Sequence, residues 1–236
     1  MTCGKYIANS LSMNKIKLLK SVDLFSELSE ADIQILGDNA TVRKYGAGDL
    51  IVGHTEKVRS FYLVLEGKVK MFRSSPEGKE QTLYIFGPGE PFCLCAAFSN
   101  DGFPASASAL NDTLIFILPG GEFERIASRY PSVLFNMMRV MSRRLKEAMD
   151  LVDSLSLKEI PQRIALFLQH MPQDEKGGVK LGMTHRELAK VVGATPESLS
   201  RTLKKMSTAE VLKVVSGNIY VLDAQLLKAL AMGEPF

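Results

Sequence analysis

The sequence of 236 residues contains no tryptophan and few of the residues that build most catalytic and metal sites. It has three histidines, and its three cysteines, Cys3, Cys93 and Cys95, are odd in number and lack the spacing of a disulfide framework. We therefore expect a protein of a reducing compartment, the cytoplasm. Ser-His-Asp, clustered-histidine and glycine-rich phosphate patterns are also missing, so we do not expect an enzyme.

Long apolar runs are absent as well. Polar and charged residues interrupt the first twenty residues, MTCGKYIANSLSMNKIKLLK, so we expect neither a signal peptide nor a membrane span. Internal repeats and low-complexity tracts are not found. Hydrophobic residues make up 46% of the chain and charged residues 23%, which is ordinary for a globular protein with one large domain or two modest ones.

The net charge of +3 is unevenly distributed. Residues 1–157 carry 18 Lys and Arg against 18 Asp and Glu, whereas residues 158–236 carry 11 against 8. The whole excess of positive charge therefore lies in the last third of the chain. A phosphate-facing surface would explain this excess, but chance explains it equally well, and only a motif can decide.

Residues 40 to 118 contain short β-branched and aromatic runs separated by Gly, Pro, Asp and Ser, which predict strands. Two runs meet at Glu66-Gly67, which predicts a tight hairpin. Pro76 and Gly78 predict a second turn. Several strands at a spacing of about ten residues predict an antiparallel barrel or jelly roll. The segment LSEADIQIL before them predicts a short helix.

Residues 131–157 predict one long helix, because they contain no glycine and no proline follows Pro131 until Pro161. Apolar residues recur at alternating steps of four and three, which is typical of a coiled-coil seam between two copies of a chain. The alternative is a single amphipathic helix that packs on its own domain, and neighbouring apolar residues suggest that the helix also packs on the strands. The predicted dimer seam consists of Leu134, Met138, Met141, Leu145, Ala148, Val152 and Leu155.

Two short helices are predicted within the stretch MTHRELAKVVGATPESLSRTLKKM. Thr184 and Glu187 have the spacing of a capping box, so a helix should begin at Thr184. Gly193 supplies the left-handed conformation that ends a helix. Thr195 then caps a second helix, with Pro196 in its first turn. Two helices joined by a turn of about three residues make a helix-turn-helix.

The second of these helices carries side chains suited to the major groove of DNA. Glu197, Ser200 and Arg201 share one face; a guanidinium can fork onto guanine, and a carboxylate can accept from the amino group of cytosine. A hairpin through Ser216–Asn218 is predicted after it. The alternative is an αα-hairpin with a solvated outer face. The predicted contacts with the DNA backbone are Thr184, His185, Thr195, Lys204 and Lys205.

The chain resembles the Crp–Fnr superfamily of dimeric bacterial transcription regulators over nearly its whole length. The resemblance lies in the order of its parts: a strand domain, a long helix, and a helix-turn-helix with a β wing. The segment YGAGDLIVGHTEKVRSFYLVLEGKVKMF is similar to that family's cyclic-nucleotide-type fold. The resemblance implies an α+β protein with an effector-sensing β jelly roll in residues 1–130, a dimerisation helix in 131–157 and a winged helix DNA-binding domain in 158–236.

The recognition pattern narrows the resemblance. Glu197, Ser200 and Arg201 match the Glu-x-x-Ser-Arg pattern of the Fnr-like branch, which implies a palindromic DNA site with TTGA-type half-sites, and RNA polymerase as a further partner. The segment DSLSLKEIPQRIALFL resembles the nitric-oxide-responsive regulators of that branch, those of the Dnr and HcpR kind.

The residues that grip cyclic AMP in the family are missing at the matching positions. Cys93-Leu94-Cys95 stands where the family has Gly-Glu-Leu, and Phe103-Pro104-Ala105 stands where the family has an Arg-Ser pair. No Arg or Lys lies between Lys79 and Arg125. A buried phosphate needs such an arginine, so we expect no tight binding of a cyclic nucleotide. Three cysteines are also too few for a four-cysteine iron–sulfur cluster.

The segment GEPFCLCAAF resembles the haem-ligand segment of the family's carbon-monoxide-sensing member. Cys93 matches its cysteine, whereas Cys95 stands where its histidine would be. A thiolate can ligate haem iron, and methionines of the long helix would line the facing side. Haem, a small apolar ligand, thiol redox chemistry and no small effector all stay open, because free cysteines are usually small buried hydrophobes. The expected effector pocket consists of Phe92, Cys93, Cys95, Met137, Met138 and Met141.

The function expected from these features is sequence-specific, dimeric DNA binding controlled by an effector in an apolar pocket, with haem as the candidate cofactor. The effector would change how the two long helices pack and so the orientation of the DNA-binding domains. Arg143 and Arg144 interrupt the apolar pattern of the long helix as a polar notch, which would allow the packing of the two helices to change. The alternatives are a regulator that responds to thiol oxidation or a small apolar ligand, and a cyclic-nucleotide-type regulatory module that does not bind DNA.

Overall fold

The computed structural model describes residues 5–7, 13–57, 59–93, 103–171, 174, 178–179 and 181–234. The chain divides into two compact units, residues 1–145 and 146–236. The long helix α5 runs from Pro131 to Leu157, the bounds predicted from the sequence, and the division between the units falls inside it.

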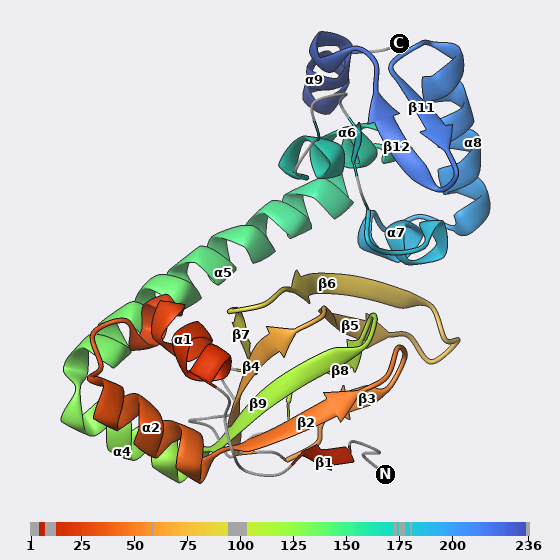
Figure 1. Cartoon of the computed structure of the whole chain (residues 1–236). Coiled ribbons are helices and arrows are strands. Elements are labelled where there is room, and N and C mark those ends of the chain that lie inside the picture. The colour runs from red at the N-terminus through yellow and green to blue at the C-terminus, as the bar shows by residue number, and fades with distance from the viewer. Residues whose placement is uncertain are drawn as a thin grey trace. The chain divides into compact units, whose positions relative to one another are not determined.

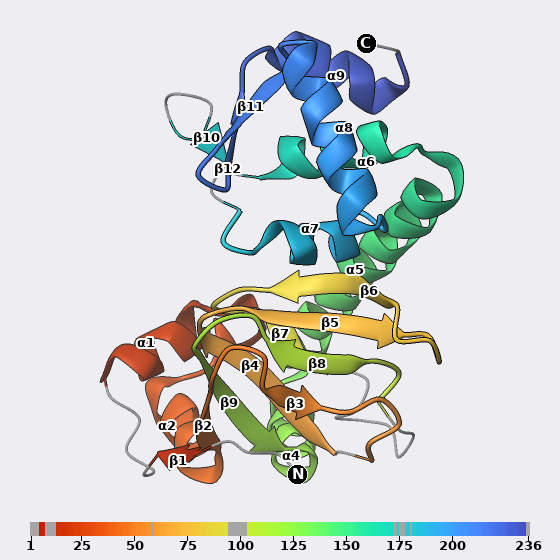
Figure 2. The ribbon, with the colours of Figure 1, turned by 90° about the vertical axis from the view of Figure 1, so that its right-hand side faces the viewer.

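The first unit contains the predicted jelly roll, built from two antiparallel sheets (Figure 1). One sheet has the strand order β1-β2-β9-β4-β7 and the other β3-β8-β5-β6; Figure 2 shows the second sheet with its four strands side by side. The strands are β1 (Lys5–Ile7), β2 (Thr41–Tyr45), β3 (Leu50–Val52), β4 (Ser60–Glu66), β5 (Val69–Ser74), β6 (Glu80–Phe86), β7 (Pro91–Phe92), β8 (Ser106–Ala109) and β9 (Thr113–Pro119).

The hairpin predicted at Glu66-Gly67 is wrong as a strand pairing. β4 pairs with β9 and β7, whereas β5 pairs with β6 and β8, so the chain crosses between the sheets at this turn. Gly67 has a φ of 83°, and a Cβ there would lie 2.4 Å from the carbonyl oxygen of Asp112. The local sequence marks the turn, but it does not determine which strands pair across it. The second predicted turn, at Gly78, does join two paired strands, β5 and β6.

Helices cover one sheet of the jelly roll and form a core with it. Phe61 of β4 lies at its centre, stacked on the ring of Phe123 with the centroids 4.9 Å apart and in edge contact with Phe25 at 5.6 Å. The predicted short helix is present and begins after Ser29, whose side chain caps it. The helices are α1 (Met13–Ser21), the 3-10 helix η1 (Asp23–Phe25), α2 (Glu30–Asn39) and α4 (Gly120–Arg129), together with the start of α5 (Figure 1).

The second unit packs helices against a three-stranded antiparallel sheet of order β10-β12-β11. Leu199, Leu203 and Met206 of one helix are buried against Leu188 and Ala189 of another. No helix in the described part of the chain combines the length and the apolarity that crossing a membrane requires. The elements are α6 (Ile160–His170), β10 (Gly178–Val179), α7 (His185–Val191), α8 (Pro196–Thr208), β11 (Leu212–Val215), β12 (Asn218–Val221) and α9 (Ala224–Met232).

Candidate DNA interface and effector pocket

The first helix of the helix-turn-helix begins and ends where the sequence predicts. Thr184 is the N-cap of α7, and its hydroxyl accepts a hydrogen bond from the amide of Glu187 at 3.2 Å. The carboxylate of Glu187 also contacts Lys190 at 3.0 Å. Gly193, just past the end of α7, has a φ of 65°, the left-handed conformation that glycine adopts at least cost.

The second helix, α8, separates a buried face from an exposed one. Its N-cap Thr195 accepts a hydrogen bond from the amide of Ser198 at 3.2 Å, and Pro196 is its first residue, so both predictions are confirmed. The buried face points into the core of the second unit. The exposed face carries the residues predicted to read bases or to contact phosphates: Glu197, Ser200, Arg201, Lys204 and Lys205.

The carboxylate of Glu197 is held in its charged form. Hydrogen bonds from its own backbone amide and from the hydroxyl of Thr195 hold its pKa below the usual value, and the nearby Arg186 acts in the same direction. An ionised carboxylate only accepts hydrogen bonds, which is what the amino group of a cytosine requires.

Three of the predicted DNA-contact residues line one cavity. His185 of α7 lies beside Ser200 and Lys204 of α8 around a space of about 300 Å³, which Val214 of the wing also lines. The wing itself is the predicted hairpin: β11 and β12 pair in register, and Ser216 and Gly217 turn the chain with φ values of 49° and 80°.

The structure separates the residues expected to form the effector pocket. Phe92 and Cys93 are buried in the interior cluster of the jelly roll. Met137 is buried in the other core, under the helices, because neighbouring residues of a helix point about 100° apart. Met138 and Met141 are exposed on α5. Cys95 lies outside the described residues, so within the described part of one chain the methionines do not meet the Cys93 thiol.

Two tyrosines belong to the same buried cluster as this thiol. Cys93 is 4% exposed, adopts a φ of 56° and shares its cluster with Tyr45 and Tyr62. Burial, and to a lesser degree the neighbouring Cys93, raise the pKa of Tyr62 above its usual value, whereas Arg43 of β2 acts in the opposite direction. Arg43 lies far before the stretch between Lys79 and Arg125 that lacks cations, so the sequence pattern does not point to it.

A second arginine, Arg144, has a contact that the sequence does not reveal. It was expected to form a notch in the dimer seam, but its side chain turns toward the jelly roll and is 19% exposed. Its guanidinium donates to Glu90 at 2.7 Å and lies over the rings of Tyr84 and Phe86 of β6. Arg143 next to it is exposed.

The predicted dimer seam is an apolar surface in this chain. Six of its seven residues are exposed, and Leu155 is partly buried. Phe135 and Met149, which are outside the predicted seam, are 64% and 66% exposed and widen the surface. So much exposed apolar area on one helix indicates an interface.

Two protein-family descriptions match this chain. Residues 42–130 match the cyclic nucleotide-binding domain, and residues 162–230 match the Crp-like helix-turn-helix domain. The two matches cover the jelly roll except β1 and the first residue of β2, the helix α4 that follows it, and most of the second unit, including the whole of α7 and α8.

Similar proteins include the cyclic AMP receptor protein of Thermus thermophilus, 31% identical over 91% of this chain and 99% of the relative. The fumarate and nitrate reduction regulatory protein of Vibrio cholerae is 26% identical over 87% of this chain and 83% of the relative.

Solved structures show the same arrangement of elements. FixK2 from Bradyrhizobium japonicum covers 81% of this chain and 96% of its own, with a TM-score of 0.72 and 25% identity. A CooA mutant from Carboxydothermus hydrogenoformans is alike in fold, with a TM-score of 0.74. It is 22% identical and covers 89% of this chain and 94% of its own. The chain therefore belongs to the Crp–Fnr family of DNA-binding transcription regulators.

Proposed function

We propose that this protein binds palindromic DNA with TTGA-type half-sites as a homodimer, and that an effector in the jelly-roll interior controls the binding. The observation that carries the proposal is the exposed face of α8, where Glu197, Ser200 and Arg201 stand together while the opposite face is buried. Regulators of this family bind DNA and are typically dimeric, and the exposed apolar surface of α5 fits a dimer. RNA polymerase is the further partner that we propose.

Binding to a labelled TTGA…TCAA duplex tests the DNA half of the proposal. Arg201→Ala should weaken binding about 10- to 100-fold, because a bidentate contact with a base contributes about 1–3 kcal/mol of discrimination. Lys228→Ala, an exposed change on α9, is the matched control and should bind like the wild type. Equal affinity of the Arg201→Ala and wild-type proteins for this duplex, or no preference of the wild type over a scrambled duplex, would refute the proposal.

Ring contacts connect the Cys93 region to the long helix, which supports control by an effector. Phe92, which precedes Cys93, packs on Phe86 with ring centroids 5.5 Å apart, and Phe86 packs on Tyr84 at 4.6 Å. Arg144 of α5 lies over Tyr84. An effector that displaces Phe92 would therefore change the surface on which α5 rests, and it would shift the balance by its difference in affinity for the two arrangements.

The effector that we propose is not a cyclic nucleotide. The stretch of jelly roll from residue 80 to residue 124 offers no Arg or Lys to a buried phosphate. Arg43, the cation that lowers the pKa of Tyr62, comes from another strand, β2. Because one similar protein is named a cyclic AMP receptor protein, cyclic AMP is the first ligand to test. Calorimetry should detect no binding at micromolar concentrations, and tight binding would refute this part of the proposal.

Haem at Cys93 is a further part of the proposal, prompted by the resemblance of the segment GEPFCLCAAF to the haem-ligand segment of the family's carbon-monoxide-sensing member. Bound haem would supply an iron that takes nitric oxide or carbon monoxide. Among the described residues the Cys93 thiolate could serve as a ligand, but the fit is incomplete, because Cys93 shares a packed interior cluster with the contacting rings of Tyr62 and Phe92. A small apolar ligand, or oxidation of the thiol itself, needs less rearrangement of these rings.

An absorption spectrum decides between these effectors. Protein expressed with haem supplied should show a Soret band that is altered by nitric oxide and lost in Cys93→Ala if haem is bound. Cys3→Ala is the control for general loss of a thiol. Thiol chemistry would be favoured instead if the protein shows no such band and if a thiol reagent or an oxidant changes its DNA affinity only when Cys93 is present.

A further inference from the structure

The side chain of Arg163 connects two helix ends within the second unit. Its Nε donates to the carbonyl oxygen of Lys158 at 2.8 Å. Its Nη1 donates to the carbonyl oxygens of Val192 and Gly193 at 3.2 and 3.3 Å. Lys158 directly follows the last residue of α5, and Val192 is the C-cap of α7. One guanidinium therefore satisfies carbonyl groups at the C-terminal ends of both helices.

Physical chemistry favours an arginine at this place. The last carbonyl groups of a helix have no partner inside the helix and carry its partial negative charge, so a cation there stabilises the helix end. The guanidinium has several donors in a fixed plane, which allows one side chain to hold carbonyl groups from two directions. Lysine would place a single ammonium group there and could not reproduce this geometry.

Arg163 itself is held rigidly by the helix that carries it. α6 begins with a capping box between Glu159 and Gln162 and has Pro161 in its first turn. The two residues that follow Arg163, Ile164 and Ala165, are completely buried. The arginine is thus fixed to the core and is only half-buried itself.

The α5–α6 junction, residues 158–159, and helix α8 are separated by open space on one side. A cavity of about 980 Å³ is lined by Lys158 of the junction, by Arg163 of α6 and by Thr202 and Lys205 of α8. Direct packing does not fill this space. The hydrogen bonds of Arg163 cross from the junction to the turn that precedes α8.

We propose that Arg163 is a positioning residue for DNA reading: it ties the end of α5 to the α7–α8 turn and so sets the inclination of α8. This inference rests on the proposed function, and it assigns to Arg163 a role separate from contact with DNA. Loss of the side chain would leave the residues of α8 in place on their helix but would let the helix tilt relative to α6.

Fluorescence anisotropy of the full chain with two duplexes tests the proposal. One duplex carries the TTGA…TCAA palindrome and the other a scrambled sequence of equal length. Arg163→Met should weaken binding to the palindrome about tenfold, the loss expected for a charge-assisted hydrogen bond, and leave binding to the scrambled duplex unchanged. Arg163→Lys should fall between the two proteins. Lys228→Met, an exposed lysine on α9, is the control for loss of one positive charge and should behave like the wild type.

Three results would overturn the inference. The first is that Arg163→Met keeps the wild-type preference for the palindrome. The second is that Arg163→Met loses affinity for both duplexes, with a salt dependence reduced by about one charge, as the loss of a phosphate contact would produce. The third is that Arg163→Lys binds like the wild type. If circular dichroism shows Arg163→Met unfolded at the assay temperature, the preference of Arg163→Lys decides in its place. A wild type without any preference would refute the proposed function instead.

Discussion

The guanidinium carbon of Arg144 lies 3.7 Å from the centroid of the Tyr84 ring, so the long helix rests on strand β6 through a cation–π contact. Glu90 strengthens the arrangement, since it accepts hydrogen bonds from Arg144 at 2.7 Å, from the hydroxyl of Tyr84 at 3.2 Å and from the amide of Gly87 at 2.7 Å. The contact holds α5 against the β6–β7 turn, directly before the strand that leads to Cys93.

Replacing Arg144 should weaken this attachment. Arg144→Met removes both the ion pair and the cation–π contact, and we expect the free energy of unfolding to fall by about 1–3 kcal/mol. Urea denaturation of the full chain measures it. Arg143→Met is the matched control, because this neighbouring arginine is exposed, and it should change stability by less than about 0.5 kcal/mol. Equal effects of the two substitutions would show that the contact contributes nothing.

Two glycines with the same backbone conformation offer a test of the crossing between the sheets. Gly67 and Gly78 have φ values of 83° and 82°, but a Cβ meets backbone atoms of Asp112 and Thr113 only at Gly67 and has open space at Gly78. Gly78→Ala should therefore cost only the left-handed strain of about 1–2 kcal/mol. Gly67→Ala should cost about 3–5 kcal/mol because the backbone must also move. Similar urea midpoints would contradict the close approach.

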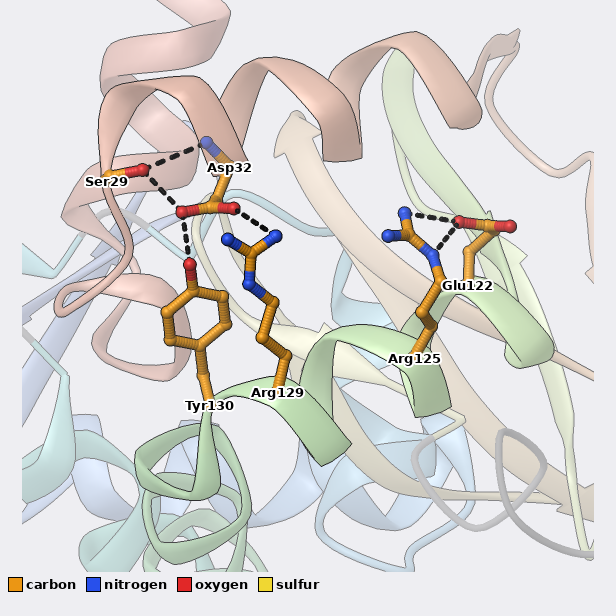
Figure 3. Close-up of polar contacts among 6 residues, drawn as sticks. All are labelled: Ser29, Asp32, Glu122, Arg125, Arg129 and Tyr130. Carbon is orange, nitrogen blue, oxygen red and sulfur yellow. Dashed lines mark hydrogen bonds and ion pairs between the residues drawn. The ribbon is translucent and has the colours of Figure 1, made fainter.

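A polar cluster joins α2 to the junction of α4 and α5 (Figure 3). The buried carboxylate of Asp32 accepts hydrogen bonds from the hydroxyls of Ser29 and Tyr130, and Arg129 lies 3.5 Å away. The hydrogen bond from Ser29, then that from Tyr130, hold the pKa of Asp32 below its usual value. The same contact with Asp32 raises the pKa of Tyr130.

This cluster predicts a pH dependence of stability. Because the folded protein lowers the pKa of Asp32, the stabilisation is fully present above the unfolded value of about 4 and is lost as the pH falls through the folded value. Asp32→Asn should lower the melting temperature at pH 7, and its difference from the wild type should shrink below about pH 4. Asp38→Asn, an exposed change on the same helix, is the control. A difference independent of pH would show that the charge of Asp32 does not stabilise the fold.

Features fixed by short segments of sequence were predicted well. The caps Thr184 and Thr195 and the left-handed Gly193 depend on a few neighbouring residues, and the structure has all three as predicted. The bounds of α5 followed from the prolines at its start and beyond its end and from its continuous heptad pattern. These features need no knowledge of the rest of the chain.

Contacts between distant segments were not predictable in the same way. The pairing of β4 with β9 joins residues about fifty positions apart, and the turn at Gly67 gives no sign of it. Arg144 and Arg163 look like ordinary helix-surface arginines until the partner segment is in place. The one available signal for Arg163 was its position beside Ile164 and Ala165, where a charged residue adjoins an apolar run and needs a partner.

The apolar face of α5 leads to the last prediction. Leu145 lies in the middle of the predicted seam and is 65% exposed, although leucine gains from burial. In a parallel pair of helices it would face its own copy, so Leu145→Lys would place two ammonium groups together in an apolar interface. We expect a monomer in sedimentation experiments, and loss of binding to the palindrome, since one half-site alone binds weakly. Leu50→Lys, the same substitution at a leucine of β3 that is 46% exposed, should remain dimeric. A dimeric Leu145→Lys protein that still binds the palindrome would place the interface elsewhere than on this helix.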